Sequence, residues 1–104
     1  MASRLQLQSL LEALFEEGEE AHVYFQPPSN ITMQYPCIIY RRDNSFTEFA
    51  GNTKYLHTKR YQVTVIDRNP DTELPDKVEE LPLCSFDRYF PAENLNHYVF
   101  TLFF

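Results

Sequence analysis

The stretch that decides the fold is Lys59-Arg60-Tyr61-Gln62-Val63-Thr64-Val65-Ile66-Asp67. Apolar and polar side chains alternate along it, with Tyr61, Val63 and Val65 on one side and polar residues between them. Successive side chains of a strand point to opposite faces of a sheet. The alternation therefore predicts a strand with one buried and one half-exposed face. The turn signal at residues 69–71, Asn-Pro-Asp, ends this strand.

Further strands are predicted on both sides of this stretch. Residues 37–40 are apolar throughout, which predicts a central strand with Pro36 at its first position. Residues 41–58 contain two turn signals, so they form either the end of a hairpin made by 37–49 and 54–66 or a long loop. A short run at 22–26 and the segments 83–90 and 96–104, joined through 91–94, complete the predicted sheet.

Two helices are predicted, one before the strands and one between them. The first has an apolar stripe with the three-and-four spacing of one helix face: Leu7, Leu10, Leu11, Leu14 and Phe15. Ser3 and Gln6 form a capping box before it, and Gly18 ends it. The second is short and runs from about Pro75 to Leu81.

The predicted order of elements is α-β-β-β-α-β-β. It indicates an α+β fold, a small mixed or antiparallel sheet flanked by an N-terminal helix and a short second helix. The chain has 104 residues, so 1–104 is a single domain. We expect the core to include Leu10, Leu11, Leu14, Ile38, Val63 and Val65.

Composition excludes several classes of protein. The chain is 43% hydrophobic and 23% charged, which is typical of globular proteins. No run approaches the roughly 18 apolar residues of a membrane span, and the N-terminus lacks the pattern of a signal peptide. Cys37 and Cys84 are too few for a disulfide framework or a zinc site, which favours a reducing, intracellular setting.

The net charge of −6 is unevenly distributed along the chain. Residues 1–35 contain one Arg and five Glu, and residues 69–104 contain two basic and seven acidic residues. Residues 36–68 contain six basic and three acidic residues, so a basic middle lies between two acidic ends. This pattern suits association between unlike surfaces of the same chain, although a simply solvated charge distribution explains it equally well.

No residue pattern points to catalysis. His22, His57 and His97 lie on different predicted elements, and Ser85 lacks the glycine motif of a nucleophile elbow. Cys37 and Cys84 are expected to be small buried hydrophobes. The carboxylates of residues 67, 71 and 76 flank a turn and a helix start, where capping explains them better than a metal does. We therefore expect neither enzymatic activity nor a cofactor.

One cluster of basic and aromatic residues stands out around the predicted hairpin. Its members are the candidate interface of the protein: Arg41, Arg42, Phe46, Phe49, Lys54, Tyr55, Lys59 and Arg60. Arginine and aromatic side chains are enriched at protein interfaces, and the same mixture also binds single-stranded nucleic acid. The segment 43–58 has too many apolar residues for a free loop, so we expect a partner to cover it.

The order of five segments is distinctive: Val23-Tyr24-Phe25-Gln26-Pro27-Pro28, Tyr35-Pro36-Cys37-Ile38-Ile39-Tyr40, Arg60-Tyr61-Gln62-Val63-Thr64-Val65-Ile66-Asp67, Phe86-Asp87-Arg88 and Asn94-Leu95-Asn96-His97. Together they resemble the small tail-completion proteins of tailed bacteriophages, also called tail terminator or neck proteins. The resemblance implies an α+β fold and a ring, usually of six subunits. Such a ring caps the tail tube, stops its polymerisation and receives the head connector while DNA passes through.

The implied partners are copies of this chain, the tail tube protein and a head-side connector or stopper protein, with DNA passing without specific binding. The implied location is the virion, after assembly in the host cytoplasm. A ring needs two different, complementary surfaces on each subunit. We therefore expect the basic residues to contact residues 71–80 or 12–20 of a neighbour. The alternatives are a single-stranded nucleic-acid-binding module using hairpin 41–60 and a small metal-dependent enzyme.

Overall fold

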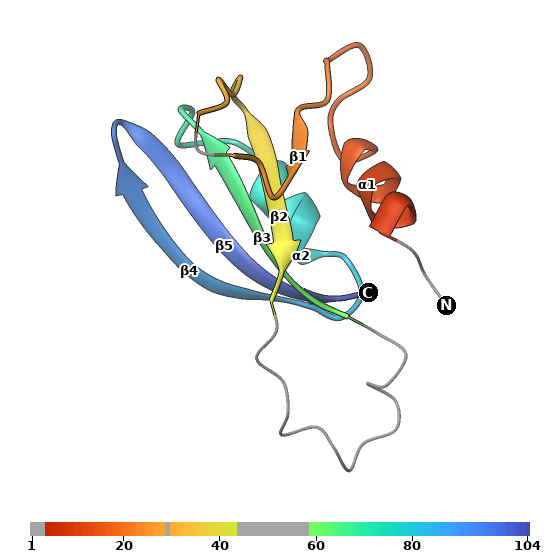
Figure 1. The fold of residues 1–104 in the computed structure, drawn as a ribbon. Helices are drawn as coiled ribbons and strands as arrows, with labels where there is room; N and C mark the ends of the chain where they lie inside the picture. Colours follow the sequence, from red (N-terminus) through yellow and green to blue (C-terminus); the bar gives the residue numbers. More distant parts are fainter. Residues whose placement is uncertain (1–3, 29, 44–58) are drawn as a thin grey trace.

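The computed structural model describes residues 4–28, 30–43 and 59–104. In these residues it has two helices and five strands (Figure 1): α1 Arg4–Glu12, β1 Val23–Phe25, β2 Cys37–Arg42, β3 Arg60–Asp67, α2 Leu74–Glu79, β4 Cys84–Ala92 and β5 Leu95–Phe103. Their order is the one predicted from the sequence, and the α+β prediction is confirmed. The predicted site residues Phe46, Phe49, Lys54 and Tyr55 lie outside the described residues.

The strands form one mixed sheet in the order β1-β2-β3-β5-β4. The short strand β1 pairs with β2 in parallel, and every other neighbouring pair is antiparallel. The alternating strand β3 is therefore the centre of the sheet, and β2 is interior but not central. The hairpin of β2 and β3 aligns Arg41 with Gln62 and Arg42 with Tyr61, which brings the predicted basic residues to one end of both strands.

Both helices pack against the same side of the sheet, which we call the helix face. The buried core on that face takes residues from both helices and from β2, β3 and β5: Leu7, Leu11, Ile38, Tyr40, Tyr61, Val63, Val65, Leu74, Val78, Phe100 and Leu102. Leu11, Ile38, Val63 and Val65 are buried, as predicted. Leu10 and Leu14 are only partly buried at the margin of this core.

The first helix is shorter than predicted. It ends at Glu12, and Leu14 and Phe15 follow in turns whose N–H groups donate to carbonyls three residues back, at 3.1 and 3.3 Å. Both side chains still pack against the core. The glutamates that follow the helix oppose the negative C-terminal end of its dipole, which favours this early end. Gly18, with a φ of 91°, supplies the turn that leads toward β1.

A buried tyrosine attaches α1 to the sheet. The side chain of Tyr40 is fully buried, and its hydroxyl donates to Oε1 of Gln8 at 2.6 Å and accepts from Nη1 of Arg4 at 3.2 Å. Nε2 of Gln8 also donates to the Val23 carbonyl at 3.2 Å, and the Arg4 guanidinium lies 4.7 Å from the ring centre of Phe25. These contacts satisfy a polar atom inside the core and fix the position of the helix.

The hairpin of β4 and β5 has a tight turn and an irregularity. Glu93 and Asn94 both have positive φ, 54° and 64°, as a two-residue hairpin turn requires, so β4 continues two residues beyond its predicted end. A β-bulge at Asp87 shifts the register. Because of this extra residue, Phe86 lies opposite Phe100, whereas Arg88 lies opposite Val99.

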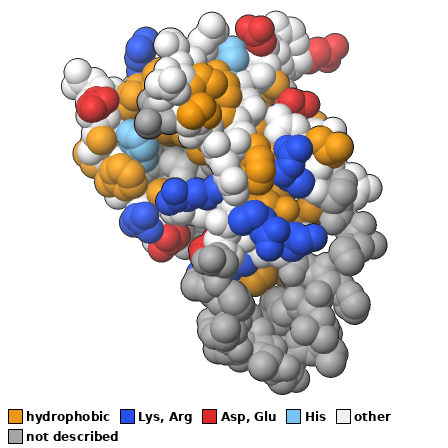
Figure 2. Space-filling view, viewed as in Figure 1, with side chains coloured by type: hydrophobic (Ala, Val, Ile, Leu, Met, Phe, Trp, Pro, Cys, Tyr) orange, Lys and Arg blue, Asp and Glu red, His pale blue; other side chains and the backbone are white. Residues whose placement is uncertain are grey.

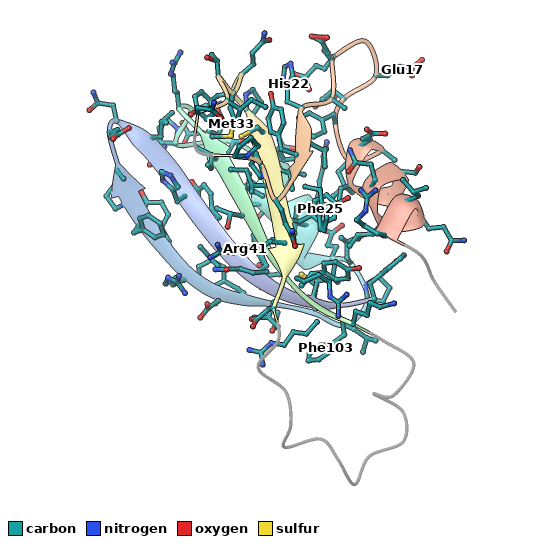
Figure 3. The ribbon with its side chains drawn as sticks, viewed as in Figure 1. Glu17, His22, Phe25, Met33, Arg41 and Phe103 are labelled. Carbon is teal, nitrogen blue, oxygen red and sulfur yellow. The ribbon has the colours of Figure 1, made fainter. Side chains whose placement is uncertain are left out.

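The side of the sheet opposite the helices, which we call the open face, is covered only in part. Near the start of β2, residues of the segment 30–36 pack on a small second cluster of buried side chains: Cys37, Ile66 and Leu95, with Tyr24, Met33, Tyr35 and Ile39 around them. Figure 3 shows Met33 over this end of the sheet and Arg41 at the other, where no described helix covers the strands.

Candidate interaction surface

A hollow of about 660 Å³ lies on the open face, between segment 26–33 and the hairpin of β4 and β5. We call it the arginine groove, after the residues that give it its character: Arg41, Arg42, Arg88, Phe90 and His97, with Gln62 and Thr64 in its floor. Figure 2 shows Lys and Arg side chains gathered in a band across this face.

Among the described residues, the lining of the arginine groove has three arginines and one histidine but no Asp or Glu. This is a strong local excess of positive charge in a chain whose net charge is −6. Asp43 and Asp87 line an adjoining hollow of about 320 Å³, which shares all three of these arginines and Gln62 with the groove. The groove therefore favours an anionic or acidic partner.

Contacts across strands position the side chains of the groove. Nε of Arg41 donates to Oε1 of Gln62 on β3 at 3.0 Å. Nη1 of Arg88 donates to Oδ2 of Asp87 at 2.7 Å, and both of these side chains are about half exposed. Phe90 stacks on His97, with ring centres 4.7 Å apart and planes 12° from parallel. The groove thus presents exposed guanidinium groups beside an exposed aromatic surface.

Of the other predicted basic residues that the structure describes, Arg42 lines the groove, whereas Lys59 and Arg60 lie beside it. Arg60 contacts Asp43 through Nε and Oδ2 at 3.3 Å, and the Asp43 N–H donates to the Arg60 carbonyl at 2.9 Å. Arg42 extends over the ring of Tyr61, 5.8 Å from its centre. Lys59 exchanges two backbone hydrogen bonds with Phe104, both 2.9 Å. Arg60 therefore has an acidic partner within its own chain, besides any that a neighbour offers.

Sequence reasoning missed the second half of the groove. Arg88, Phe90 and His97 come from the β4–β5 hairpin, which is far from residues 41–60 in the chain but reaches them because β5 pairs with β3. The order of the strands in the sheet was predicted only in part, and nothing in the sequence indicates the bulge at Asp87.

The two thiols lack the properties of nucleophiles. Burial and, to a smaller extent, the Asp67 carboxylate raise the pKa of the Cys37 thiol to about 12. Burial and the Glu79 carboxylate raise the pKa of the Cys84 thiol to about 11. A thiol reacts as its thiolate, so both side chains are almost wholly in the unreactive form at neutral pH.

Of the carboxylates of residues 67, 71 and 76, that of Asp67 stabilises a turn in the β3–α2 connection, and none caps α2. Oδ1 of Asp67 accepts from the Asn69 N–H at 3.0 Å, and Oδ1 of Asn69 accepts from the Asp71 N–H at 3.0 Å. Thr72 then accepts from the Leu74 N–H at 3.3 Å where α2 begins. Within the described part of the chain, no three His, Cys, Asp or Glu side chains are arranged to hold a metal ion.

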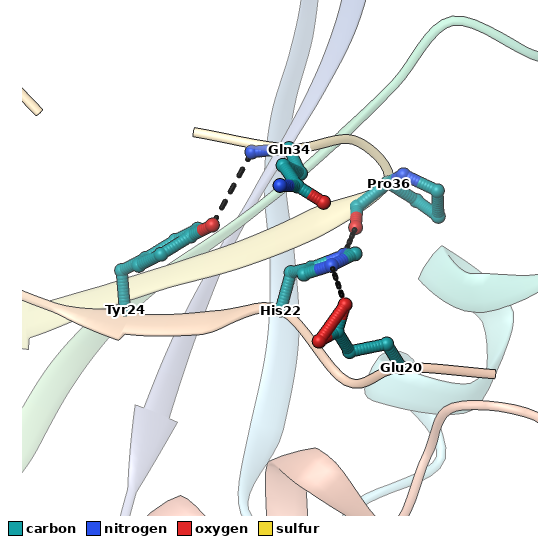
Figure 4. Close-up of polar contacts among 5 residues, drawn as sticks. All are labelled: Glu20, His22, Tyr24, Gln34 and Pro36. Atoms are coloured by element: carbon teal, nitrogen blue, oxygen red, sulfur yellow. Dashed lines mark hydrogen bonds and ion pairs between the residues drawn. The ribbon is translucent and has the colours of Figure 1, made fainter. Parts of the chain in front are cut away.

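His22 and His97 lie in separate environments, and His57 is outside the described residues. The ring nitrogens of His22 lie 3.3 Å from the Pro36 carbonyl and 3.3 Å from a carboxylate oxygen of Glu20 (Figure 4). The hydroxyl of Tyr24 accepts from the Gln34 N–H at 3.2 Å nearby. These contacts attach β1 to the segment that precedes β2, so His22 has a structural role.

Neither described helix is long and apolar enough to cross a membrane.

The strongest candidate for an interaction site on the described surface is the arginine groove, which is positively charged, has an aromatic wall and is built from two hairpins. No protein-family model, curated protein or solved structure matches the chain.

Proposed function

We propose that this protein is a structural subunit that forms a ring and completes a bacteriophage tail. In this role the ring, of six subunits as the resemblance implies, caps the tail tube, stops its polymerisation and joins it to the head connector. DNA passes through the ring without specific binding. The proposal rests on the resemblance of the sequence segments to tail-completion proteins and on the arginine groove.

The main support from the structure is that this acidic chain concentrates cations in a groove whose described lining residues include no carboxylate. A closed ring uses a heterologous interface, in which one patch of each subunit meets a different patch of the next. Acidic residues elsewhere on the chain supply that second patch. One group of them, represented by Glu17 in the connection from α1 to β1, lies well away from Arg41 (Figure 3).

The test is the mass of the protein in solution, by sedimentation velocity, alone and with purified tail tubes. We expect either a species of six times 12.4 kDa or a ring that forms on tube ends and stops their growth. A chain that stays monomeric and neither binds nor terminates tubes overturns the proposal.

A charge-reversal variant sharpens this test. Arg41→Glu combined with Arg88→Glu should abolish assembly and leave the fold intact, because both side chains are exposed. Reversal of Arg42 and Arg60 is a poorer choice, since the side chain of Arg60 is only 26% exposed and contacts Asp43 within its own chain, whereas that of Arg88 is 56% exposed. Arg68→Glu, an exposed arginine outside the groove lining, serves as the single-charge control for Arg41→Glu alone.

A single-stranded nucleic-acid-binding module is the second candidate. The stacked pair of Phe90 and His97 lies beside Arg41 and Arg88 in one groove, and aromatic stacking next to cations is how such modules hold bases and phosphates. Fluorescence anisotropy with a labelled single-stranded oligonucleotide tests it. Binding that weakens steeply with salt and is lost in Phe90→Ala favours this function over the ring.

A further inference from the structure

A second hollow, of about 370 Å³, lies on the helix face between α2 and the hairpin of β4 and β5. Its floor is aromatic and its rim is acidic. We call it the acidic aromatic groove and define it by Asp76, Glu79, Phe86, Tyr89 and Tyr98. The described part of its lining has no Lys or Arg, which is the reverse of the arginine groove.

The aromatic floor is exposed and held in place. Phe86 is 46% exposed and meets the buried ring of Phe100 edge-on, with centres 5.5 Å apart. Tyr89 is 47% exposed, its ring centre lies 5.1 Å from that of Tyr98, and its hydroxyl donates to Oδ1 of Asn96 at 2.6 Å. Two large rings are thus fixed at the surface, where a ligand meets them without reordering.

The carboxylates of α2 make this site negative. Burial, then Tyr89 and the carboxylates of Asp67, Asp71 and Asp76, raise the pKa of Tyr98 in the floor. Glu79 has the same effect on Cys84, next to burial. Lys77, the basic residue of α2, points elsewhere, since its Nζ donates to the Leu14 carbonyl at 3.3 Å.

An exposed aromatic floor with a carboxylate rim matches the chemistry of a guanidinium group. Arginine forms paired hydrogen bonds to carboxylates and stacks on aromatic rings, and it sheds water more readily than lysine. We propose that the acidic aromatic groove of one subunit receives Arg88, with Arg41 beside it, from the open face of a second copy of this chain. The inference rests on the proposed function and names the two surfaces that meet.

This contact is favoured over the other acidic surface, residues 16–20. Three of its four glutamates have partners within the chain: Glu16 lies 4.0 Å from Lys77, Glu20 lies 3.3 Å from His22, and Glu19 accepts from the Glu16 N–H at 3.1 Å. The hollow beside that segment, of about 410 Å³, contains Lys77 in its described lining and Phe15 as its one described aromatic side chain. Because β4 carries Arg88 on one face and Tyr89 on the other, every copy presents both halves of the contact.

The experiment is a charge-swap rescue, read by sedimentation velocity of the full chain, with tail tubes added if rings form only on them. Arg88→Glu and Glu79→Arg should each weaken assembly about tenfold or more, since each sets like charges against each other. The combination of both substitutions should restore assembly to within a few-fold of the original. Thermal unfolding of each variant confirms that it folds.

The matched control pairs Arg88→Glu with Glu17→Arg, which gives the same net charge but changes the other acidic surface. We expect no rescue there. An uncharged probe, Phe86→Ala, should weaken assembly through loss of the aromatic floor.

Three outcomes overturn the inference while the proposed function stands: rings that tolerate both single substitutions, rescue by Glu17→Arg, or no rescue by Glu79→Arg in a folded protein. If the original chain neither forms rings nor binds tubes, the proposed function itself fails. The proposed contact is supported only if each single substitution weakens assembly and the combination of Arg88→Glu with Glu79→Arg restores it.

Discussion

The helix face and the open face of the sheet are made from alternate residues of the same strands. On β3, Tyr61 and Val63 are at most 2% exposed on the helix face, while Gln62 and Thr64 line the arginine groove on the other side. The helix face buries one large apolar cluster. Among the described residues, the open face buries the three-residue cluster next to residues 30–36 and, in the arginine groove, Val99. The difference teaches that stability is concentrated on one face and that the other is left available for recognition.

The largest effect should come from a cavity on the helix face. Leu11→Ala removes a fully buried side chain of α1, so the free energy of unfolding should fall by about 2–5 kcal/mol. Urea denaturation measures it. Leu5→Ala on the same helix is the control, because Leu5 is 65% exposed and its loss should cost little. Equal losses of unfolding free energy in the two variants would contradict the conclusion that the helix face carries the stability of the fold.

A hydroxyl deletion on each face should give the next largest difference. Tyr40→Phe removes the buried group that donates to Gln8 and accepts from Arg4, so it should cost about 1–3 kcal/mol. Tyr24→Phe removes a hydroxyl that accepts one backbone hydrogen bond in an exposed contact, and it should cost less. Chemical denaturation of both variants decides the order, and a reversed order would contradict the assignment of the core.

The second buried cluster should make the free energy of unfolding depend on pH in the alkaline range, through Cys37. The Cys37 thiol has its pKa raised from 9.0 to about 12, so the folded chain holds this proton more tightly than the unfolded chain. The contribution of this protonated thiol to the free energy of unfolding is therefore fully present below about pH 9, and it is lost as the pH rises from there toward 12.

Cys37→Ala isolates this contribution from the lysines and tyrosines that titrate in the same range. The difference in unfolding free energy between the original chain and the variant should shift in favour of the variant as the pH rises above 9. A difference that stays constant up to pH 11 would show that the thiol is not buried in the folded protein.

The smallest effect should come from the floor of the arginine groove. Gln62→Ala deletes one hydrogen bond with Arg41 at a half-exposed position, so the unfolding free energy should change by no more than about 0.5 kcal/mol. A loss comparable to that of Leu11→Ala would mean that the open face also carries the stability of the sheet. Thermal unfolding of the two variants side by side makes the comparison.

The sequence predicts the helix face well because burial repeats regularly there. The two-residue period of 59–67 located β3, its buried residues and its half-exposed face, and the run 37–40 located β2. The predicted end of the first helix was wrong, because the apolar spacing continues beyond Glu12, where α1 ends. Leu14 and Phe15 fit the stripe of α1, yet they pack from turns after Glu12, because packing needs only their side chains on the core.

The open face is less predictable because it depends on which hairpins become neighbours. Arg41 belongs to the cluster around residues 41–60, but Arg88 and Phe90 line the same groove only because β5 pairs with β3. No feature of the sequence near Arg88 indicates that pairing. A strict two-residue period would also place Arg88 on the same side as Phe86, whereas the register places it on the other.

That register shift sets the single residue Asp87 apart from the other residues of β4. Deleting one codon there would make Phe86 and Arg88 consecutive, so both residues would keep their present faces, because consecutive residues of a strand face opposite sides. One residue lost or gained in the regular part of β4 would instead exchange the two rows of side chains on one side of the change. Asp87 therefore marks a position in this strand where the loss of a residue leaves both surfaces with the side chains that they present now.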